Sequence, residues 1–248
     1  ATGNSFPFPD CLVHFDTQGK TSQSSAVSGI NGLVTVQWTP ENDNDRLTAK
    51  LVNKDGQIIS EAVFTPELDC GGNFTATGGG ITINGITWAT RNVGAPGTFV
   101  ASPEDYGEYY QWNKGTTGFL LYDDYYASAY AEGNAWLPEN DPCPAGWRVP
   151  TDAEFDNLIA STDHSWTSSN GVNGYRFGCG SNSLFLPAAG GRSGSDGSIG
   201  YAGSLGYYWS STPYDSHGAH GLYFSSGYVY TSYFSNRAYG HSVRCVTE

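Results

Sequence analysis

The sequence has few basic residues. Its 248 positions hold 11 lysines and arginines against 24 aspartates and glutamates, which gives a formal net charge of −13. The basic residues form no cluster along the chain. Nucleic acids and anionic membrane surfaces attract proteins through concentrated positive charge. We therefore expect no nucleic-acid partner.

Methionine and long hydrophobic runs are also lacking. No apolar stretch approaches the roughly 20 residues that a helix needs to cross a bilayer, so we expect no transmembrane segment. No signal peptide is recognisable, and the chain has 0 methionines, the initiator included. The simplest interpretation is a processed or truncated mature chain.

Cysteines are few and widely spaced. The five are Cys11, Cys70, Cys143, Cys179 and Cys245, and none forms a Cys-x-x-Cys pair, which excludes zinc ribbons and thioredoxin-like redox motifs. Wide spacing favours disulfides and an oxidising, extracytoplasmic setting, whereas the alternative is five buried, reduced thiols. Because the number is odd, disulfide pairing leaves one thiol free, and we assign this role to Cys179.

Glycine, proline and aromatic residues are abundant, with 33 glycines, 12 prolines and 15% aromatics. This composition predicts a fold rich in strands and loops. Apolar residues alternate with period two at residues 33–38, 47–52 and 57–64, and the Asp-Gly pair at 55–56 predicts a tight hairpin turn. We expect residues 1–78 to form a small β-sandwich that serves as a stalk or assembly domain.

A second domain is expected over residues 79–248. Residues 77–80 contain three consecutive glycines and are the best candidate for a linker. Directly after them, residues 81–89 alternate around an Asn-Gly pair, which predicts a hairpin.

One helix has a clear start signal. Thr151 and Glu154 have the spacing of a capping box, in which the side chain of each residue accepts a hydrogen bond from the backbone N–H of the other. Phe155, Leu158 and Ile159 follow at the spacing of a buried stripe.

Residues 207–248 use a narrow set of amino acids, mainly Tyr, Ser, Gly, Phe, His, Asn and Thr. Antibody paratopes use a similar set, because Tyr supplies rigid amphipathic contact area and Ser, Gly and Asn supply adaptable hydrogen bonds. The segment is therefore better suited to binding than to acid–base catalysis.

Five sequence motifs are specific when taken together. The second of them begins with Pro-Cys-Pro-Ala-Gly-Trp-Arg-Val-Pro at residue 142. The motifs lie at residues 86–94, 142–155, 184–190, 208–212 and 242–246. Together they resemble the major paralogous domain of Fibrobacter and Bacteroides surface proteins, over residues 81–248. The resemblance implies a C-type-lectin-like fold related to formylglycine-generating enzymes. The expected fold class is α+β: a small N-terminal β-sandwich, then a C-type-lectin-like domain with few helices and many short antiparallel strands.

The resemblance also implies a location and a role. The family includes surface and fimbrial adhesins and the variable proteins of diversity-generating retroelements. We therefore expect an extracellular protein of a bacterial cell surface, outer-membrane anchored or fimbrial. Its partner would be a protein or glycan on another cell or surface, or another surface subunit. Retroelement mutagenesis cannot produce Lys, Gln, Glu, Met or Trp at the mutated codons, and none of these occurs between Ser210 and Thr247.

Disulfide pairing is a further implication of the C-type-lectin resemblance. It pairs Cys143 with Cys245, which ties the segment before the helix to the end of the chain. Cys11 and Cys70 would then close the first domain.

On the family pattern, the framework of the C-terminal segment includes Trp209, Ser210, Arg237, Arg244 and Cys245. The positions between them are expected to face a ligand, and Tyr228 and Tyr230 should share one strand face. For any single position the alternative is packing on or decorating a strand. The expected ligand-binding residues are Tyr214, His217, His220, Tyr223, Ser225, Tyr228, Tyr230, Tyr233, Phe234, Asn236, Tyr239 and His241.

Two other functions stay open. A calcium-independent carbohydrate-binding module would stack sugars on Tyr109, Trp112 and Tyr125. An enzyme of the formylglycine-generating type would need a reactive cysteine pair, and Cys179 has no evident partner in the sequence.

We expect no catalytic residue, no metal and no cofactor. His217 and His220 have a spacing that could hold a metal on a helix, but their segment reads as loop or strand and lacks a third ligand. Residues 138–141 have the composition of a calcium-lectin loop without its order.

Overall fold

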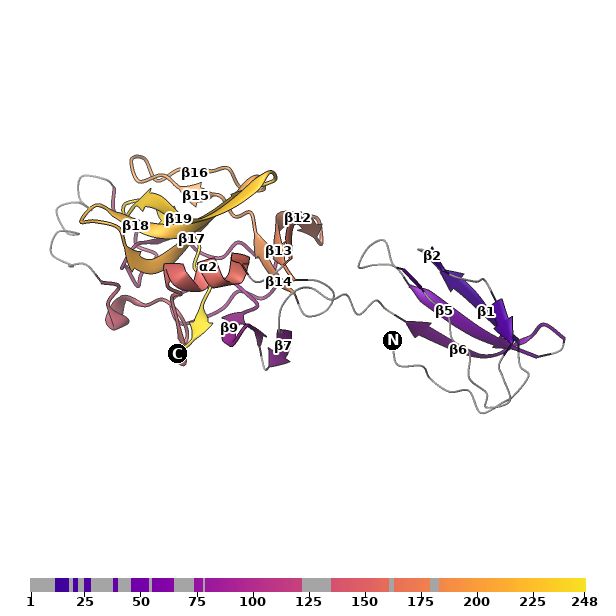
Figure 1. Cartoon of the computed structure of the whole chain (residues 1–248). Helices are drawn as coiled ribbons and strands as arrows, with labels where there is room; N and C mark the ends of the chain where they lie inside the picture. Colours follow the sequence, from indigo (N-terminus) through magenta and orange to yellow (C-terminus); the bar gives the residue numbers. More distant parts are fainter. Residues whose placement is uncertain are drawn as a thin grey trace. The chain divides into compact units, whose positions relative to one another are not determined.

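The chain is divided into two compact units, Ala1–Asp69 and Cys70–Glu248 (Figure 1). The structure is a computed structural model. It describes residues 12–17, 20–21, 25–27, 38–39, 46–53, 55–64, 74–77, 79–121, 135–160, 163–178 and 183–248.

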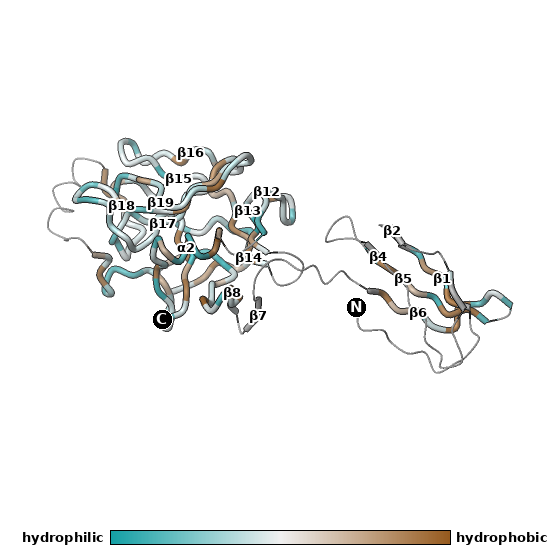
Figure 2. The backbone as a smooth tube through the Cα atoms, viewed as in Figure 1, coloured by the Kyte–Doolittle hydropathy of each residue, from teal (hydrophilic) through white to brown (hydrophobic). Residues whose placement is uncertain are grey.

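The first unit is built from antiparallel strands. A four-stranded sheet has the order β3-β1-β5-β6, and β2 pairs with β4. The strands are β1 (Leu12–Thr17), β2 (Lys20–Thr21), β3 (Ser25–Val27), β4 (Trp38–Thr39), β5 (Leu47–Val52) and β6 (Ile58–Phe64). Figure 2 shows hydrophobic residues along β5 and β6. Most of the predicted strand at 33–38 lies outside the described residues, and the sandwich stays a prediction.

Alternation and turn chemistry explain the β5–β6 hairpin. Leu47, Ala49 and Leu51 are buried, with half-buried residues between them, as expected for a strand with one face on a core. In the turn, the Asn53 side-chain oxygen accepts hydrogen bonds from the backbone N–H groups of residues 55 and 57. Gly56 adopts a positive φ of 79°. The predicted strands at 47–52 and 57–64 are confirmed within one residue.

Among its described residues, the second unit consists mainly of short antiparallel strands in four sheets, with orders β11-β21-β9-β8-β7, β10-β20-β15-β16, β12-β13-β14 and β17-β18-β19. The strands are β7 (Phe74–Thr77), β8 (Gly80–Ile83), β9 (Ile86–Ala89), β10 (Tyr110–Gln111), β11 (Trp147–Arg148), β12 (His164–Ser169), β13 (Val172–Phe177), β14 (Leu184–Pro187), β15 (Gly191–Arg192), β16 (Ile199–Gly200), β17 (Leu205–Pro213), β18 (Gly218–Ser225), β19 (Tyr228–Asn236), β20 (Gly240–His241) and β21 (Val246–Thr247).

The expected α+β class is wrong, because helix is a minor component of the described residues, which are mostly in strands and turns. Within the described ranges the structure has a single α-helix, α2 (Asp152–Ala160), and one 3-10 turn, η1 (Pro138–Asn140). The physical reason lies in the sequence pattern. Helical periodicity occurs only around residues 151–160, whereas the remaining apolar residues alternate or form short runs between glycines. In this described part, no helix is long and apolar enough to cross a membrane.

Gly79 and Gly80, from the predicted linker, lie at a hairpin within the second unit. Thr77 pairs with Gly80 as β7 joins β8, and Gly79 adopts a φ of 103° in the turn. A Cβ on Gly80 would lie 2.9 Å from the Trp147 ring, so only glycine fits there. The next hairpin, β8–β9, turns at Asn84 and Gly85 with φ of 49° and 85°, which confirms the predicted Asn-Gly turn.

Helix α2 begins with the predicted capping box. The Thr151 hydroxyl accepts from the Glu154 N–H at 3.3 Å, and the Glu154 carboxylate accepts from the Thr151 N–H at 2.7 Å. Arg148 donates to both carboxylate oxygens of Glu154, at 2.8 and 2.6 Å. This ion pair joins β11 to the start of the helix.

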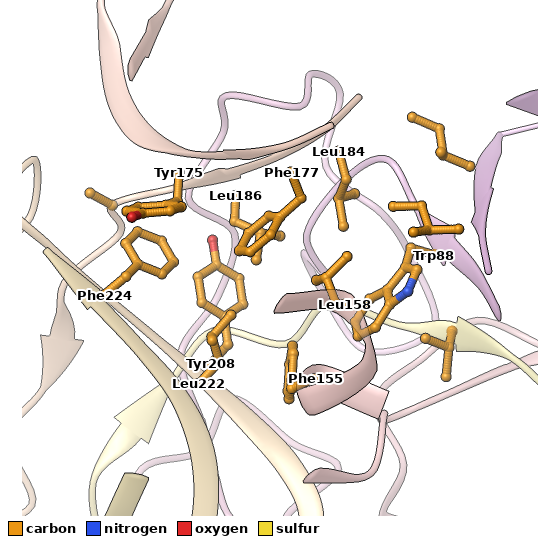
Figure 3. Packing of buried hydrophobic residues seen from close by; sticks show 14 residues of the cluster. Trp88, Phe155, Leu158, Tyr175, Phe177, Leu184, Leu186, Tyr208, Leu222 and Phe224 are labelled. Atoms are coloured by element: carbon orange, nitrogen blue, oxygen red, sulfur yellow. The ribbon is translucent and has the colours of Figure 1, made fainter. Parts of the chain in front are cut away.

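The helix packs its apolar face into the main core of the second unit (Figure 3). Phe155 and Leu158 are fully buried, and the Phe155 ring lies 5.2 Å from the Trp88 ring. Tyr208, Leu222 and Phe224 enter the same core from β17 and β18. Burying each such side chain stabilises the fold by roughly 1.5–3 kcal/mol. The sheet β17-β18-β19 is thereby fixed to α2 along one of its faces.

Candidate ligand-binding surface

The sheet β17-β18-β19 carries most of the residues that the sequence assigns to a ligand. It is an antiparallel meander in which Tyr207 pairs with Tyr223, and Tyr223 pairs with Tyr230. Successive side chains of a strand point to opposite faces. Tyr208, Leu222 and Phe224 point into the core with α2, so their neighbours Tyr207 and Tyr223 point to the other face.

Five tyrosines gather on this outer face, which we call the tyrosine face: Tyr207, Tyr223, Tyr228, Tyr230 and Tyr233. The Tyr223 ring is at the centre, with its centroid 5.0 Å from Tyr207 and 4.8 Å from Tyr233. The Tyr228 and Tyr230 rings lie 5.7 and 6.4 Å from Tyr223. Tyr230 is 54% exposed and Tyr228 is 45% exposed, so the cluster forms a surface and not a core.

The tyrosine face is uncharged at neutral pH and rich in hydroxyl groups. Burial raises the pKa of Tyr207 to about 12, and it also raises the pKa of Tyr223 and of Tyr233. The hydrogen bond between the Tyr223 and Tyr228 hydroxyls, 3.4 Å long, lowers the pKa of Tyr228. Neutral phenols both donate and accept hydrogen bonds, so the face can match many polar groups.

Ser225 and Tyr239 lie near this cluster. Ser225 pairs with Tyr228, and its hydroxyl accepts from the Gly227 N–H at 3.3 Å in the β18–β19 turn. The Tyr239 ring is exposed and lies 6.4 Å from His241, nearly parallel to it. Both residues extend the surface around the five tyrosines.

The structure divides the predicted set between the two faces of the sheet. His220 pairs with Phe234, and both occupy the face opposite to the tyrosine face, since each is adjacent in sequence to a residue of the Gly221–Tyr233 pair. The Tyr214 ring meets both, 5.3 Å from His220 and 5.1 Å from Phe234. Tyr214 and Phe234 are exposed, so this forms a second, smaller aromatic patch.

His217 and Asn236 fix local turns beside that patch. The His217 N–H donates to the Asp215 carboxylate at 2.7 Å, and the His217 ring nitrogen Nδ1 lies 2.9 Å from the Ser216 hydroxyl. The Asn236 side-chain oxygen accepts from the Ala238 N–H at 2.9 Å. Both side chains are half-buried, and their role in binding stays a prediction.

His241 does not face the solvent as the sequence analysis expects. It is 5% exposed and lies beneath the tyrosine face, 5.1 Å from the Tyr207 ring and 4.2 Å from the Trp209 ring. Its Nε2 lies 2.6 Å from the Ser235 hydroxyl, and Nδ1 lies 3.0 Å from the Gly240 carbonyl oxygen. Burial lowers the pKa of His241 to about 3, so the ring is neutral in the folded protein.

Tyr207 is a member of the tyrosine face that sequence reasoning missed. It directly precedes the motif at 208–212, and the family pattern assigns it neither to the framework nor to the ligand-facing positions. The sequence does carry one signal for it: Tyr207 and Trp209 are two positions apart in β17, so their side chains lie on the same side of the strand. The pairing with Tyr223 becomes visible only with the strand register.

The framework residues form the buried support of the sheet. Arg237 is 1% exposed, and its guanidinium carbon lies 4.0 Å from the centre of the Trp112 ring, a cation–π contact. Arg237 also donates to the Asp215 carbonyl oxygen at 2.6 Å. Arg244 is fully buried and donates through Nε to the Asn92 side-chain oxygen at 2.9 Å.

Two of the three residues proposed to stack sugars, Trp112 and Tyr109, are buried and not available for that role. Trp112 is 0% exposed, and its indole N–H donates to the Ser210 carbonyl oxygen at 2.9 Å. Tyr109 is also buried, and its hydroxyl donates to the Ala189 carbonyl oxygen at 2.5 Å. Tyr125 lies outside the described residues.

The predicted disulfide Cys143–Cys245 is confirmed, with 6.1 Å between the two Cα atoms. Cys245 is therefore not a free thiol. Cys11, Cys70 and Cys179 lie outside the described residues. Over the part of the chain that the structure describes, no group of three His, Cys, Asp or Glu side chains could hold a metal ion.

An open cavity of about 440 Å³ lies beside this disulfide, between Trp136 and Trp147. Two of its charged lining groups, Asp141 and Arg148, already have partners. The Asp141 carboxylate accepts from the N–H groups of Cys143 and Val149, both at 2.9 Å, and burial raises the pKa of Asp141. The cavity is lined by groups that hold the fold together, and it carries no evident ligand chemistry.

The family model of the Fibrobacter succinogenes major domain matches residues 81–247. This match confirms the part of the resemblance that concerns the Fibrobacter domain. No curated protein matches the chain, and no solved structure matches it. The relation to C-type lectins and to retroelement proteins stays a prediction.

Proposed function

The chain belongs to the Fibrobacter succinogenes major domain family, and on this premise we propose that it is a ligand-binding, adhesin-like protein of a bacterial cell surface. The tyrosine face is the surface that captures the ligand. One observation carries the proposal: exposed, neutral tyrosine rings pack against one another on a sheet whose other face is fixed to a core. Exposed aromatic clusters on soluble proteins mark interaction sites.

The rigidity of this surface supports binding with little loss of conformational entropy. Tyrosine has few rotatable bonds, and the rings of the tyrosine face restrict one another before any ligand arrives. The proposed mechanism is non-covalent capture, in which ring edges supply contact area and hydroxyl groups orient the ligand. A few central residues should carry most of the binding free energy.

The packing of the rings favours a protein ligand over a glycan. A sugar stacks on an open aromatic face. Tyr223 and Tyr233 stack on each other at 4.8 Å, and Tyr207 lies 5.0 Å from Tyr223, so these neighbours cover much of the ring faces. The edges and hydroxyl groups stay available, and they suit the mixed polar and apolar surface of a protein.

Replacing Tyr228, Tyr230 and Tyr233 by alanine should abolish capture. We expect binding of the labelled full chain to intact bacterial or epithelial cells, measured by flow cytometry, to fall at least about 30-fold, because one central hot spot is worth about 2 kcal/mol or more. The matched control is Tyr214→Ala with Phe234→Ala, which removes exposed aromatics from the opposite face and should leave binding unchanged.

Treatment of the target cells distinguishes the ligand classes. Protease should remove the binding sites, whereas periodate oxidation of glycans should leave them. Equal binding by the triple variant and the wild type would show that capture occurs elsewhere. Binding that is lost after periodate treatment but kept after protease treatment would show that the ligand is a glycan and not a protein.

Burial also supports the proposal that the C-terminal segment is diversified by a retroelement. The framework positions Trp209, Arg244 and Cys245 are fully buried, whereas Tyr228 and Tyr230 are among the most exposed aromatics. Substitution at exposed positions costs little stability. Sequencing the same locus across a population should find changes at the exposed tyrosines and none at the framework. A near-repeat of the 3′ end beside a reverse transcriptase would identify the template, and uniform variation across both sets would contradict the proposal.

A further inference from the structure

The spacing of two tyrosines on the tyrosine face is unusual for a β-strand. Tyr230 and Tyr233 are three positions apart in β19, and a regular strand would place them on opposite faces. Nevertheless both rings lie beside Tyr223, at 6.4 and 4.8 Å. The strand must therefore depart from regular alternation between them.

A β-bulge supplies the departure. Tyr223 pairs with Tyr230, and Gly221 pairs with Tyr233, so Leu222 alone faces the two residues at 231–232. One extra residue on a strand restores the same face after an odd step. Ser232 takes up the change with a φ of 52°, which a non-glycine residue seldom adopts.

A carboxylate of the helix holds this bulge. Asp152, in the first turn of α2, accepts from the Ser232 N–H at 3.0 Å and from the Ser232 hydroxyl at 2.5 Å. The backbone N–H of Asp152 donates to the Thr212 hydroxyl of β17 at 3.0 Å. Asp152 is 9% exposed, and hydrogen bonds to a carboxylate are stronger than those between neutral groups.

We propose that Asp152 is the positioning residue of the tyrosine face: its hydrogen bonds hold Ser232 in the bulge that places Tyr233 beside Tyr223. The proposal rests on the proposed function for its biological meaning, but its geometry does not need a ligand. Without the bulge, regular alternation would turn Tyr233 towards α2 and bring Phe234 to the outer face. The same sequence would then present a different aromatic surface.

Nuclear Overhauser contacts between tyrosine rings of the full chain test the proposal without a ligand. Asp152→Ala should lose the cross-peak between the Tyr223 and Tyr233 rings and keep the one between Tyr207 and Tyr223, which does not depend on the bulge. Asp152→Asn keeps one oxygen for the Ser232 N–H and should restore the lost cross-peak. The matched control is Asp156→Ala, an exposed carboxylate of the same helix, which should change neither signal.

Two variants of Ser232 test the same bulge from the strand side. Ser232→Gly keeps the N–H and tolerates a positive φ, so it should keep the Tyr223–Tyr233 cross-peak. Ser232→Val places a branched side chain at that φ and should lose it. Should Asp152→Ala not fold, Ser232→Val decides, since it leaves α2 intact.

A Tyr223–Tyr233 cross-peak of wild-type strength in folded Asp152→Ala, or in Ser232→Val, would overturn the positioning role. These outcomes are separate from the failure of the proposed function. If the tyrosine face binds nothing, the ring contacts can still depend on Asp152. If Asp152 has no positioning role, the tyrosine variants still test whether the tyrosine face binds a ligand.

Discussion

Replacing Cys143 and Cys245 by alanine should lower the free energy of unfolding of the second unit by about 4–5 kcal/mol. The disulfide closes a segment with a sequence separation of 102, and a cross-link of this span removes many conformations from the unfolded chain. Such a loss is a large part of the stability of an ordinary domain. Urea unfolding followed by tryptophan fluorescence measures it, since six of the seven tryptophans lie in this unit.

Single variants provide the control. Cys143→Ala and Cys245→Ala each remove the same cross-link, so each should destabilise almost as much as the double variant. Reduction of the wild-type protein should have a similar effect without any change of side chain. A loss below about 1 kcal/mol would mean that the unfolded chain is already compact around this segment, and that the entropic account is wrong.

Local features of the fold were predictable from the sequence. The capping box at Thr151 and Glu154 and the Asn-Gly turn at 84–85 depend on residues within one turn of each other. The strands at 47–52 and 57–64 follow from alternation with period two. The Cys143–Cys245 bond was predicted too, but from the family resemblance and not from spacing.

The arrangement of the candidate site was not predictable in the same way. Alternation assigns faces within one strand, but a bulge at 231–232 reverses the assignment for everything after it. The signal for that bulge is a contact between Ser232 and Asp152, 80 positions apart. The placement of Tyr233 on the tyrosine face and of Phe234 on the opposite face follows from this bulge, whereas His220 and Tyr223 lie on opposite faces by regular alternation in β18.

The burial of His241 has a similar cause. A histidine among tyrosines and serines has the composition of a binding surface, yet this one lies between Tyr207 and Trp209. Its position follows from the pairing of β20 with β10 and β15, which are distant in sequence. The erroneous α+β class has a different origin, since it came from the family resemblance and gave one short helix too much weight.

Lowering the pH from 6.5 to 4 should cost the protein about 3 kcal/mol of stability through His241 alone. Burial lowers the pKa of His241 from 6.5 to about 3. Between these two pH values the histidine is protonated in the unfolded chain and neutral in the folded protein. The contribution is fully present above pH 6.5 and falls by about 1.4 kcal/mol for each pH unit down to the folded pKa. His241 stays neutral in the folded protein over this range, so its contact with Tyr207 is kept until the protein unfolds.

The difference between the wild type and His241→Gln isolates this effect. Buried Asp141, whose pKa is raised, acts in the opposite direction in acid, and it is present in both proteins. We expect His241→Gln to be less stable than the wild type at pH 8, since it loses the ring contacts with Tyr207 and Trp209. Its stability should then fall less steeply below pH 6.5, so that the two curves approach each other near pH 4. Parallel curves from urea unfolding across this range would mean that His241 is protonated in the folded protein, and that the tyrosine face is supported by a charged ring.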